Sequence, residues 1–424
     1  GSADKALFSQ MAKMPKALGL SSGVIGLIGL LPGIPALPFF AIGLGLALAA
    51  HRLGAANKSM SSTTAAMPAE IGPASPGPDE NTLKEARQLD ELRIEIGYGL
   101  MSLVNAQGGS DRLTEQIRAL RRSLASDMGF IMPSVRILDN VMLEANKYVV
   151  YLKEIESGTG LVYPDQLMAM DPTGAAVKIS GIPVLEPTFG LAATWIDQTL
   201  REEAQLMGYT VVDAATVITT HLTEIVKGNV AELITYVDVQ KLLRELSKEH
   251  NDLLKELVPS QISTTAIQRV LQSLLSERVS IRDLGTIIEG VADAVSSTKS
   301  SREIVEIVRQ RLSRQLCSQY ANAAGQLPII ALSPQWETRF AEAIIGQGDE
   351  RHLAMAPSKL SEFAALVRER FEDAARLGEA PVLVTSTQAR PFVRAIVERF
   401  RRETPVISQA EIHLRAKLKT ISSI

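Results

Sequence analysis

The spacing of hydrophobic and polar residues changes several times along the chain, and residues 182–228 carry its clearest pattern. This segment begins as an extended, proline-marked stretch, after which an apolar run from Ala192 to Met207 predicts a helix. A short β-rich piece follows at Tyr209–Val212. Asp213 is placed to cap a second helix, and Gly228 is placed to end it. We therefore expect an extended turn, a helix, a short strand and a second helix.

The second helix of this segment has two different faces. Three apolar residues recur at the 3.6-residue period and predict a buried stripe: Ile218, Leu222 and Ile225. The opposite side is neutral and rich in threonine: Thr216, Thr220, Thr223 and Lys227. Hydroxyl groups can keep a hydrogen-bond partner when another molecule covers them, so covering this side costs little free energy. The pattern indicates a contact surface for another protein.

Upstream of this segment, strand and helix patterns alternate. Three ranges have the composition and alternation of strands: 92–99, 135–138 and 147–155. Ser110 is placed to begin a helix that ends at Gly129. Residues 163–182 are irregular, with only short β-like pieces. This mixture predicts a small α/β domain with an α+β unit inserted into it.

From Tyr236 to about Ser318 the pattern is that of consecutive amphipathic helices, which predicts an all-helical domain. Ser280 followed by Asp283 resembles a capping box at the start of the third helix. The predicted helices cover 239–258, 264–279, 281–297 and 302–320. The last part returns to α/β, with strands at 327–332, 381–385, 405–412 and 413–421 and helices after Ser333, after Pro357 and over 389–402. The fold class predicted for the chain is α+β multidomain.

The first 56 residues follow neither pattern. An uncharged run from Ala17 to Ala50 is interrupted by LLPGIPALP, whose prolines cannot continue a helix. Each arm approaches the ~20 residues of a membrane span, and basic residues on both sides predict that both ends lie in the cytoplasm. We expect a transmembrane hairpin; a signal peptide and a buried hydrophobic hairpin are the alternatives. Residues 57–91 are rich in small and polar residues and predict a flexible linker.

Composition narrows the class of protein. Aromatic residues make up only 4% of the chain, so its cores must be built from aliphatic side chains. The net charge of −3 lacks the basic character of a nucleic-acid binder. Cys317 is the single cysteine, which excludes a disulfide framework and indicates a reducing compartment. The leading Gly1-Ser2 resembles a remnant of tag removal, so we expect the natural chain to begin further upstream.

Motifs for catalysis and for cofactor or metal binding are absent from the sequence. It has neither a Gly-x-x-x-x-Gly-Lys-Ser/Thr run for phosphate nor a Gly-x-Gly-x-x-Gly turn after a strand. Its five histidines are scattered, and no two stand four residues apart to bind zinc. His221 and Cys317 are predicted to be packed structural residues. We therefore predict no catalytic residue, no cofactor and no metal site.

Five blocks of sequence carry a resemblance and follow one another in collinear order: LRIEIGYGLMSLV, MGFIMPSVRILDN, LEPTFGLAATWID, GYTVVDAATVITTHLTEIV and LLSERVSIRDLGTIIEGVAD. Over nearly its whole length the chain resembles the bacterial export-gate family of type III secretion, in its flagellar branch. The stretch LLPGIPALPFF is similar to the turn between the last two membrane helices of that family, which implies a hairpin over 1–56. The resemblance also implies four cytoplasmic subdomains: 92–164 with 214–232, an inserted one at 165–213, a helical one at 233–318 and a last one at 319–424.

The resemblance further implies a function. Members of the family sit in the bacterial inner membrane with most of this region in the cytoplasm, where they form a ring of nine copies. The ring docks export chaperone–substrate complexes and late export substrates, and its other partners are export ATPase components and the remaining membrane proteins of the gate. The docking site is a dimple between the first two subdomains, here Pro172, Glu186, Phe189, Val212, Val217 and Thr220. Glu186 stands where flagellar relatives commonly carry aspartate, so the charge is kept on a longer side chain.

Two alternatives to a flagellar docking platform remain open from the residues. The first is an export gate of a virulence injectisome. The second, of a different class, is a membrane-tethered enzyme with a site in one of the α/β units. The sequence has no cluster of titratable residues that would converge on a substrate, which favours the platform. The lining of the largest pocket distinguishes the classes: an apolar, threonine-lined pocket indicates docking, whereas a polar cleft with perturbed carboxylates indicates an enzyme.

Overall fold

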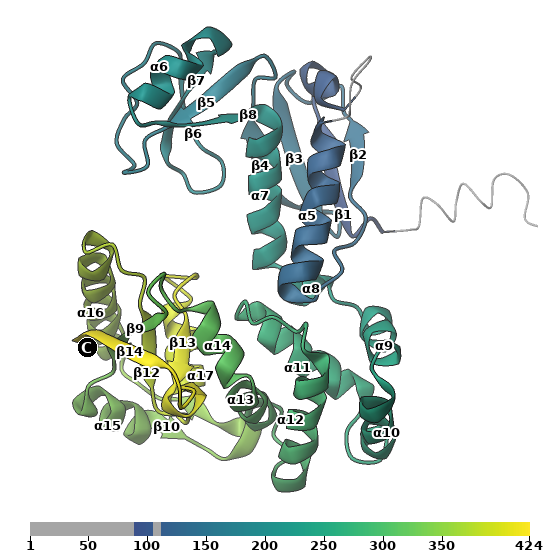
Figure 1. The fold of residues 1–424 in the computed structure, drawn as a ribbon, viewed down its shortest axis with the longest axis vertical. Coiled ribbons are helices and arrows are strands. Elements are labelled where there is room, and N and C mark those ends of the chain that lie inside the picture. Colours follow the sequence, from purple (N-terminus) through teal and green to yellow (C-terminus); the bar gives the residue numbers. More distant parts are fainter. Residues whose placement is uncertain (1–88, 105–111) are drawn as a thin grey trace, which may run out of the picture. The chain divides into compact units, whose positions relative to one another are not determined.

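The computed structural model describes residues 89–104 and 112–424, which lie within one compact unit, Lys84–Ile424 (Figure 1). The predicted hairpin at 1–56 and all but the last residues of the predicted linker lie outside the described residues. Within the described ranges, every helix is too short or too polar to cross a membrane. The described part has three four-stranded sheets and a block of helices, which makes it a mixed α/β fold.

The first sheet has the strand order β2-β1-β3-β4, with β1 parallel to β2 and antiparallel to β3. Its strands are β1 (Leu92–Ile96), β2 (Arg136–Asp139), β3 (Lys147–Leu152) and β4 (Ile155–Leu161). The prediction of one strand over 147–155 was wrong: Lys153 and Glu154 have positive φ angles of 47° and 67° and form a tight turn between two antiparallel strands. The end of the strand predicted over 92–99 was also wrong: Gly97 is the N-cap of the 3-10 helix η2 (Tyr98–Leu103), to which the next two residues belong.

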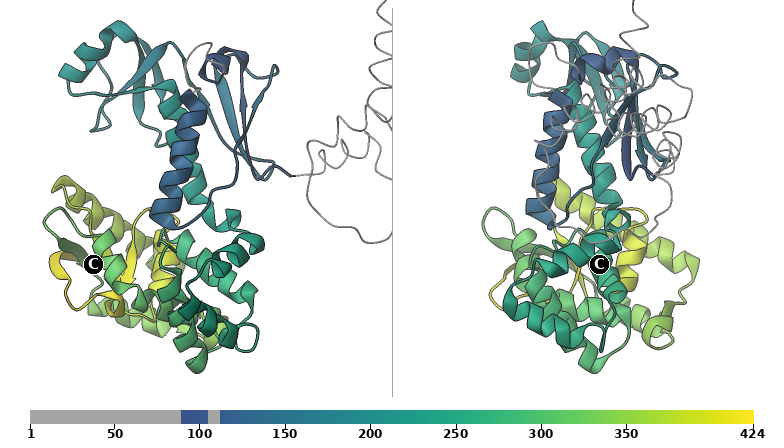
Figure 2. Two further views of the ribbon diagram at one scale, coloured as in Figure 1. Left: turned by 45° about the vertical axis from the view of Figure 1, so that its right-hand side comes forward. Right: turned by 90° about the vertical axis from the view of Figure 1, so that its right-hand side faces the viewer.

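Two long helices lie side by side against this sheet, α5 (Arg112–Met128) and α7 (Ala214–Gly228) (Figures 1 and 2). Both predictions for α7 are confirmed. The carboxylate of Asp213 accepts the backbone N–H of Thr216 at 2.8 Å, as an N-cap does, and the apolar stripe is buried. This stripe meets the side chains of α5, such as Leu120 and Leu124, in one hydrophobic core.

The inserted unit is an antiparallel sheet with the order β6-β7-β5-β8. Its strands are β5 (Gln166–Met170), β6 (Ile182–Leu185), β7 (Ala192–Asp197) and β8 (Thr210–Asp213). The helix predicted over 192–207 was wrong for its first half, which is β7; only the 3-10 helix η3 (Gln198–Leu200) and α6 (Arg201–Leu206) are helical.

The physical reason for this error is that β7 is a central strand buried on both faces. Trp195 on one face belongs to the core shared with the first sheet, whereas Ile196 on the other face packs with Ala204 of α6. A strand covered on both sides reads as a continuous apolar run, which periodicity cannot distinguish from a buried helix. Pairing with β5 and β6 decides the outcome.

The helical block follows directly. It consists of α8 (Val230–Leu233), α9 (Tyr236–Arg244), α10 (Lys248–Leu257), α11 (Thr264–Ser276), α12 (Leu284–Ser297), α13 (Ser301–Arg311) and α14 (Ser313–Gln319). Two of the predicted long helices are each divided in two, at 245–247 and at Leu312. The N-cap of α12 is Asp283 rather than Ser280, since its carboxylate accepts the N–H of Thr286 at 3.1 Å.

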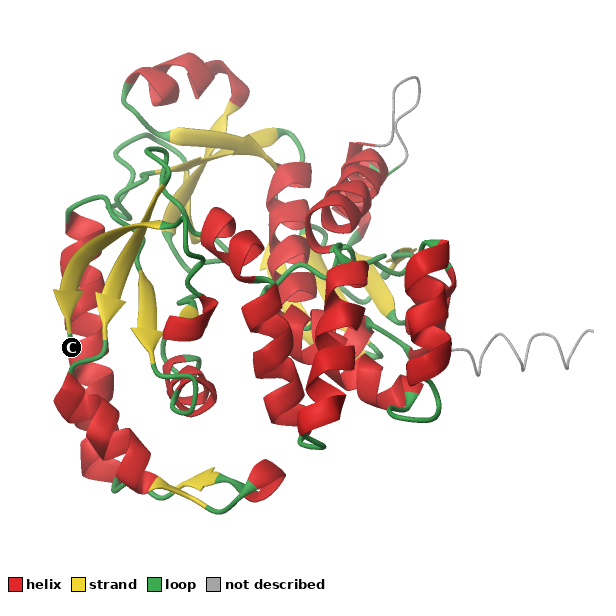
Figure 3. Ribbon diagram, turned by 60° about the horizontal axis from the view of Figure 1, so that its bottom comes forward, coloured by secondary structure: helices red, strands yellow, loops and turns green. Residues whose placement is uncertain are grey.

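The last unit contains a parallel sheet with the order β13-β12-β9-β14, flanked by helices (Figure 3). Its strands are β9 (Gln326–Ala331), β12 (Val382–Thr385), β13 (Val406–Ser408) and β14 (Lys417–Ser423), and its helices are α15 (Pro334–Ala343), α16 (Pro357–Arg376) and α17 (Arg390–Val397). A small hairpin joins β10 (Ile344–Ile345) to β11 (His352–Leu353), with the 3-10 turn η4 (Gly348–Glu350) between them.

Three elements of this unit differ from their predictions. Helix α17 ends at Val397 rather than Arg402. The strand predicted over 405–412 stops at Ser408 and becomes the 3-10 turn η5 (Gln409–Glu411), because the side chain of Glu411 is drawn into a buried ion pair. The last strand begins at Lys417 instead of His413. Cys317 is buried beside this sheet, as predicted.

Candidate functional site

The loop between β6 and β7 is closed by Glu186. Its carboxylate accepts the backbone N–H groups of Thr188 at 2.9 Å and of Phe189 at 2.6 Å. The backbone of Glu186 also pairs across the loop, accepting from the N–H of Gly190 at 3.0 Å and donating to the carbonyl of Leu191 at 2.8 Å. Gly190 has a φ of 68°, which glycine adopts without strain. The loop is therefore a single closed turn with its acid inside.

This closed turn presents an aromatic side chain. Phe189 is 58% exposed, whereas Glu186 is only 4% exposed. Further apolar side chains are exposed on β6 and at the start of β7, and sequence reasoning missed them: Ile182, Leu185 and Leu191. Their signal in the sequence was weak because β6 is a four-residue edge strand that contains a proline. Together these residues form an apolar patch on the inserted unit.

A neutral polar pair lies next to Glu186 in the first sheet and α7. The Tyr148 hydroxyl and Nδ1 of His221 share a hydrogen bond of 2.7 Å. Burial raises the pKa of Tyr148 well above its usual range, and the charge of Glu186 adds to that effect. Burial lowers the pKa of His221, with Glu186 acting in the opposite direction. The prediction of a packed, hydrogen-bonded His221 is confirmed.

Two glycines of β4 make room for this pair. A Cβ atom on Gly158 would stand 2.8 Å from the His221 ring and 2.5 Å from Cδ1 of Ile225. A Cβ atom on Gly160 would stand 2.7 Å from the Tyr148 hydroxyl oxygen. The close approach of β4 to α7 therefore depends on the absence of a side chain at Gly158, and the position of the Tyr148 ring of β3 depends on its absence at Gly160.

The other residues of the predicted docking site occupy different environments. Pro172 is exposed, in a turn whose Gly174 would bring a Cβ atom within 3.6 Å of the Leu191 side chain, so this turn adjoins the apolar patch. Val212 and Thr220 are half-buried. Val217 is 2% exposed and belongs to the core.

The threonine side of α7 is not one free surface. Gln116 of α5 donates to the Thr216 hydroxyl at 3.3 Å and accepts from the Thr219 hydroxyl at 3.0 Å. At the other end of α7, Thr223 and Lys227 line a cavity instead. The prediction of a continuous contact face is therefore corrected, since α5 covers its first turn.

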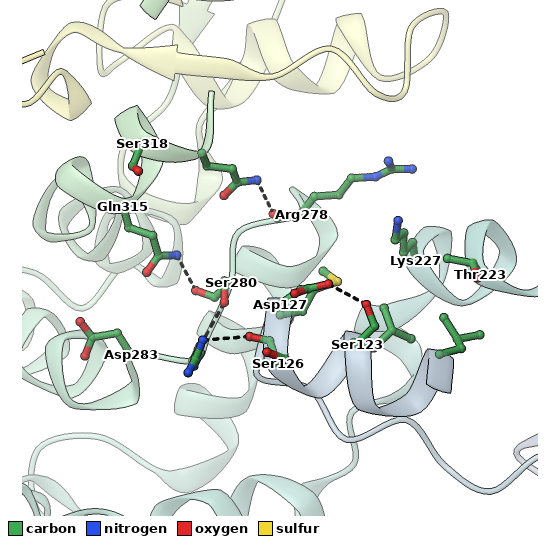
Figure 4. A pocket seen from close by; sticks show the side chains of 15 residues that line it. Ser123, Ser126, Asp127, Thr223, Lys227, Arg278, Ser280, Asp283, Gln315 and Ser318 are labelled. Carbon is green, nitrogen blue, oxygen red and sulfur yellow. Dashed lines mark hydrogen bonds between the residues drawn. The ribbon is translucent and has the colours of Figure 1, made fainter. Parts of the chain in front are cut away.

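That cavity, of about 890 Å³, lies between the ends of α5 and α7, the segment 278–283 and α14 (Figure 4). Many of its polar side chains hold its own walls together. Arg282 donates to the carbonyl of Ser126 at 3.3 Å, and Gln315 donates to the carbonyl of Ser280 at 3.0 Å. Arg278 pairs with Glu224 at 3.0 Å. In the described ranges no three His, Cys, Asp or Glu side chains are grouped to hold a metal ion.

A second cluster of charges lies between the helical block and the last sheet, and sequence reasoning missed it. Arg309 of α13 contacts Glu411 at 2.7 Å and Glu277 at 3.1 Å. Arg390 of α17 contacts Glu277 at 2.6 Å and is paired with Glu306 as well. We call these five residues the buried ion network. Its members come from four segments that are far apart in the sequence, so no local sequence pattern predicts the network.

Comparison with solved structures defines the class of this fold. The chain resembles the Chlamydia pneumoniae CdsV protein with a TM-score of 0.68 and 21% identity, over 79% of this chain and 96% of that one. It also resembles nonameric EPEC SctV-C, determined by cryo-EM, with a TM-score of 0.65 and 20% identity, over 80% of this chain and 99% of that one. At this level of identity the likeness establishes the fold.

The sequence comparison establishes the family. The chain belongs to the FHIPEP family, whose model matches residues 1–417. It is 52% identical over 426 residues to the flagellar biosynthesis protein FlhA of Caulobacter vibrioides, covering 100% of this chain and 60% of that protein. It is 33% identical over 424 residues to FlhA of Escherichia coli, covering 99% of this chain and 59% of that protein. The chain thus spans about three-fifths of the length of these relatives.

Proposed function

We propose that this chain is part of a flagellar export gate and that it docks export chaperone–substrate complexes on the cytoplasmic side of the inner membrane. Membership of the FHIPEP family over residues 1–417 supports the export-gate role. The flagellar branch is favoured over an injectisome because curated relatives at 52% and 33% identity are flagellar biosynthesis proteins. The EscV cytosolic domain from a type III secretion system shares only 22% identity.

The observation that carries the docking proposal is the exposed Phe189. Its side chain is 58% exposed and stands on a loop that four hydrogen bonds hold closed. Such a residue can act as a rigid apolar anchor that inserts into a pocket of a partner protein. Leu185, 72% exposed on the adjoining strand, extends the apolar area. The only acid of the loop is buried, so the loop itself presents no charge.

This surface favours a protein partner over a small substrate. The anchor and its apolar neighbours stand on an exposed strand and loop, where an amphipathic helix of a chaperone could cover them. The enzyme alternative receives less support. Several polar side chains of the 890 Å³ cavity are engaged in structural contacts. The larger pocket, of about 1060 Å³ beside α5, has a single acid, Glu115, among its lining residues. Docking at the inserted unit is therefore the function that the geometry supports best.

The rest of the proposed arrangement follows the family. A hairpin over 1–56 would anchor the chain in the membrane, a linker over 57–91 would separate it from the described part, and the subdomains would begin and end at 92–164 with 214–232, 165–213, 233–318 and 319–424. Ring formation by several copies is supported by the nonameric SctV-C and EscV structures. Components of the export ATPase and the other membrane proteins of the gate complete the proposed set of partners.

Calorimetry with a purified flagellar chaperone–substrate complex tests the docking site. Phe189→Ala in the full chain is expected to weaken docking by ~2 kcal/mol or more, the loss typical of a buried aromatic anchor, while the thermal transition is kept. Leu377→Ala is the matched control, because Leu377 is a comparably exposed apolar side chain at the end of α16. Thr220→Asp places a charge next to the apolar patch. We expect it to weaken docking at least as much as Phe189→Ala, which removes the phenyl ring.

The proposal for this site would be abandoned if the folded Phe189→Ala protein bound the complex as tightly as the Leu377→Ala control. A loss of equal size in both variants would likewise show that the effect is not specific to the loop. Docking by another surface would then be mapped from the remaining exposed apolar side chains.

A further inference from the structure

Arg278, just after the end of α11, has a backbone conformation that usually belongs to glycine. Its φ angle is 58°. The N–H of Arg278 donates to the carbonyl of Leu275 and the N–H of Val279 to that of Leu274, both at 2.9 Å, which is the pattern of a Schellman motif. Glycine is preferred at this position, because a Cβ atom makes the left-handed conformation costly. An arginine here points to a use of its side chain.

The Arg278 side chain contacts two units other than its own. Its Nη2 atom lies 3.0 Å from the Glu224 carboxylate of α7 and 3.2 Å from the Glu403 carboxylate, which follows α17 in the last unit. Figure 4 shows the side chain extending toward the end of α7 that carries Lys227. The backbone carbonyl of Arg278 accepts from Gln319 of α14 at 3.1 Å, which holds the turn in place. One residue thus links α7, the helical block and the last unit.

We propose that Arg278, with Glu224 and Glu403, is a releasable clasp that holds the last unit against α7. Its release lets the last unit turn about α13 while every unit stays folded. This device lies beyond the docking function, since it does not depend on which partner docks or where.

The contacts between the last unit and the helical block explain why a clasp is needed. They gather along α13. At its start, Asp349 accepts from the Ser300 hydroxyl at 2.6 Å, and near its end Arg309 contacts Glu411 at 2.7 Å. Contacts along a single helix resist separation of two units more than rotation about that helix. The clasp reaches α7, a helix outside this block, and therefore opposes the rotation.

The segment that carries Glu403 reaches the end of α7 by a second contact. A Cβ atom on Gly228, the last residue of α7, would stand 3.7 Å from Nη1 of Arg402. The carbonyl groups at the end of a helix carry partial negative charge and attract a cation. Arg402 and the clasp therefore hold the last unit at the same point of α7.

The clasp differs from the buried ion network in its exposure to water. The side chains of Arg278 and Glu403 are 31% and 64% exposed, whereas Arg309 and Arg390 of the network are 2% and 1% exposed. Salt screens exposed pairs and has much less effect on buried ones. A pair as exposed as the clasp biases an equilibrium by no more than roughly fivefold. Salt can therefore release the clasp and leave the network closed.

Substitutions at Arg278 separate the backbone from the side chain. Arg278→Gly and Arg278→Asn both suit the positive φ angle and both remove the charge. Arg278→Lys keeps the charge but lacks the forked guanidinium that meets two carboxylates at once. Glu403→Gln removes the partner in the last unit. Glu398→Gln is its matched control, because Glu398 is an exposed acid of the same segment that pairs with Arg394 at 4.0 Å instead.

The distance between β4 and α16 measures the clasp directly. Spin labels on Ser157→Cys of β4 and Ser361→Cys of α16 report this distance by electron double resonance in the full chain. The buried cysteine is changed by Cys317→Ser, so that only the two introduced cysteines are labelled. Labelled chains are diluted with unlabelled ones, so that distances between copies do not contribute.

The expected results follow from the exposure of the clasp. The unaltered clasp gives one narrow distance distribution at about 0.1 M salt and a second, shifted population at about 0.5 M. Arg278→Gly, Arg278→Asn and Glu403→Gln show the second population at both salt concentrations, enlarged by up to roughly fivefold at the lower one. Arg278→Lys lies between these variants and the unaltered clasp. The control Glu398→Gln behaves as the unaltered clasp does.

Thermal transitions separate release of the clasp from loss of folding. Arg278→Gly is expected to unfold within about 2 °C of the unaltered chain or above it, because glycine suits the turn. A transition lowered by more than about 5 °C would make Arg278 a plain stability residue and overturn the clasp. Unchanged distances in folded Arg278→Gly and Glu403→Gln would overturn it as well. No docking partner enters these measurements, so failure of the proposed docking site leaves their outcome unchanged.

Discussion

The protein joins its units by two chemically different junctions. Between the first sheet and the inserted sheet, contact is made by apolar side chains such as Trp195. The neutral pair of Tyr148 and His221 joins β3 of the first sheet to α7. Between the helical block and the last sheet, contact is made by the buried ion network: Glu277, Glu306, Arg309, Arg390 and Glu411. The first junction borders the proposed docking surface, whereas none of the proposed docking residues belongs to the second junction.

The difference shows what each junction must achieve. A surface that accepts a neutral, apolar partner is best supported by groups that carry no free charge, since nearby charges make covering it costly. A junction that does not support a binding surface can use charge pairs. Such pairs hold two units in one arrangement, because each broken pair leaves a buried ion without a partner. We infer that the helical block and the last sheet are held in a fixed relation, while the docking side depends on packing.

The ion network also contains more acids than bases, and the two central glutamates respond differently. Burial by itself raises the pKa of Glu277, but the guanidinium groups of Arg390 and Arg309 outweigh burial and hold it at about 2. For Glu306, burial prevails over its pairing with Arg390 and the pKa is raised. The network thus has one carboxylate that the folded state stabilises as an ion and one that it does not.

The largest effect is expected from removing the shared cation. Arg390 is 1% exposed and contacts three carboxylates. Arg390→Met leaves Glu306 without its cation and leaves Glu277 and Glu411 to Arg309 alone, so it should lower the free energy of unfolding by about 3–5 kcal/mol. Arg368→Met is the control, because Arg368 is exposed and only overlies the Phe400 ring at 5.1 Å. Urea unfolding of both variants measures the difference. Equal losses would mean that the network does not stabilise the junction.

A smaller effect separates the two glutamates. Glu277→Gln should cost ~2–3 kcal/mol at pH 7, because its folded pKa of about 2 lies below the ordinary value and the ion is therefore stabilised. That contribution is present above the unfolded pKa of 4.5 and is lost as pH falls toward 2, so the variant should differ least from the unaltered chain in acid. Glu306→Gln should change stability by no more than about 1 kcal/mol, because its ion is disfavoured by burial. The prediction fails if urea unfolding ranks the two variants in the opposite order.

The smallest effect belongs to the docking side. Burial lowers the folded pKa of His221, so the unfolded chain takes up the proton first as pH falls below about 6.5. Its contribution to stability is therefore present above that pH and is lost on acidification, at a rate of at most about 1.4 kcal/mol for each pH unit. His221→Gln should flatten this part of the curve of unfolding free energy between about pH 7.5 and 5.5. If the unfolding free energy of His221→Gln depends on pH in the same way as that of the unaltered chain, other groups cause the pH dependence.

Sequence alone determined those elements whose cause is local. The cap at Asp213, the buried stripe of α7 and the packed state of His221 follow from residues within about two turns of one another, so periodicity and capping chemistry reveal them. The central strands of the last sheet, β9 and β12, were also recognised, because short β-rich runs bounded by turns leave few alternatives. The family resemblance identified the loop that carries Phe189.

Only the tertiary structure decided the remainder, because the causes lie in distant segments. Whether 192–197 is helix or strand depends on pairing with β5 and β6. Whether the Glu186 carboxylate is exposed or buried depends on how the loop closes, and the resemblance placed the residue in the docking site without its hydrogen bonds. The buried ion network requires Arg309 and Glu411 to meet across 102 positions of sequence, and nothing in either neighbourhood foretells the other. Local chemistry sets the elements, and long-range pairing decides which side chains remain free to bind.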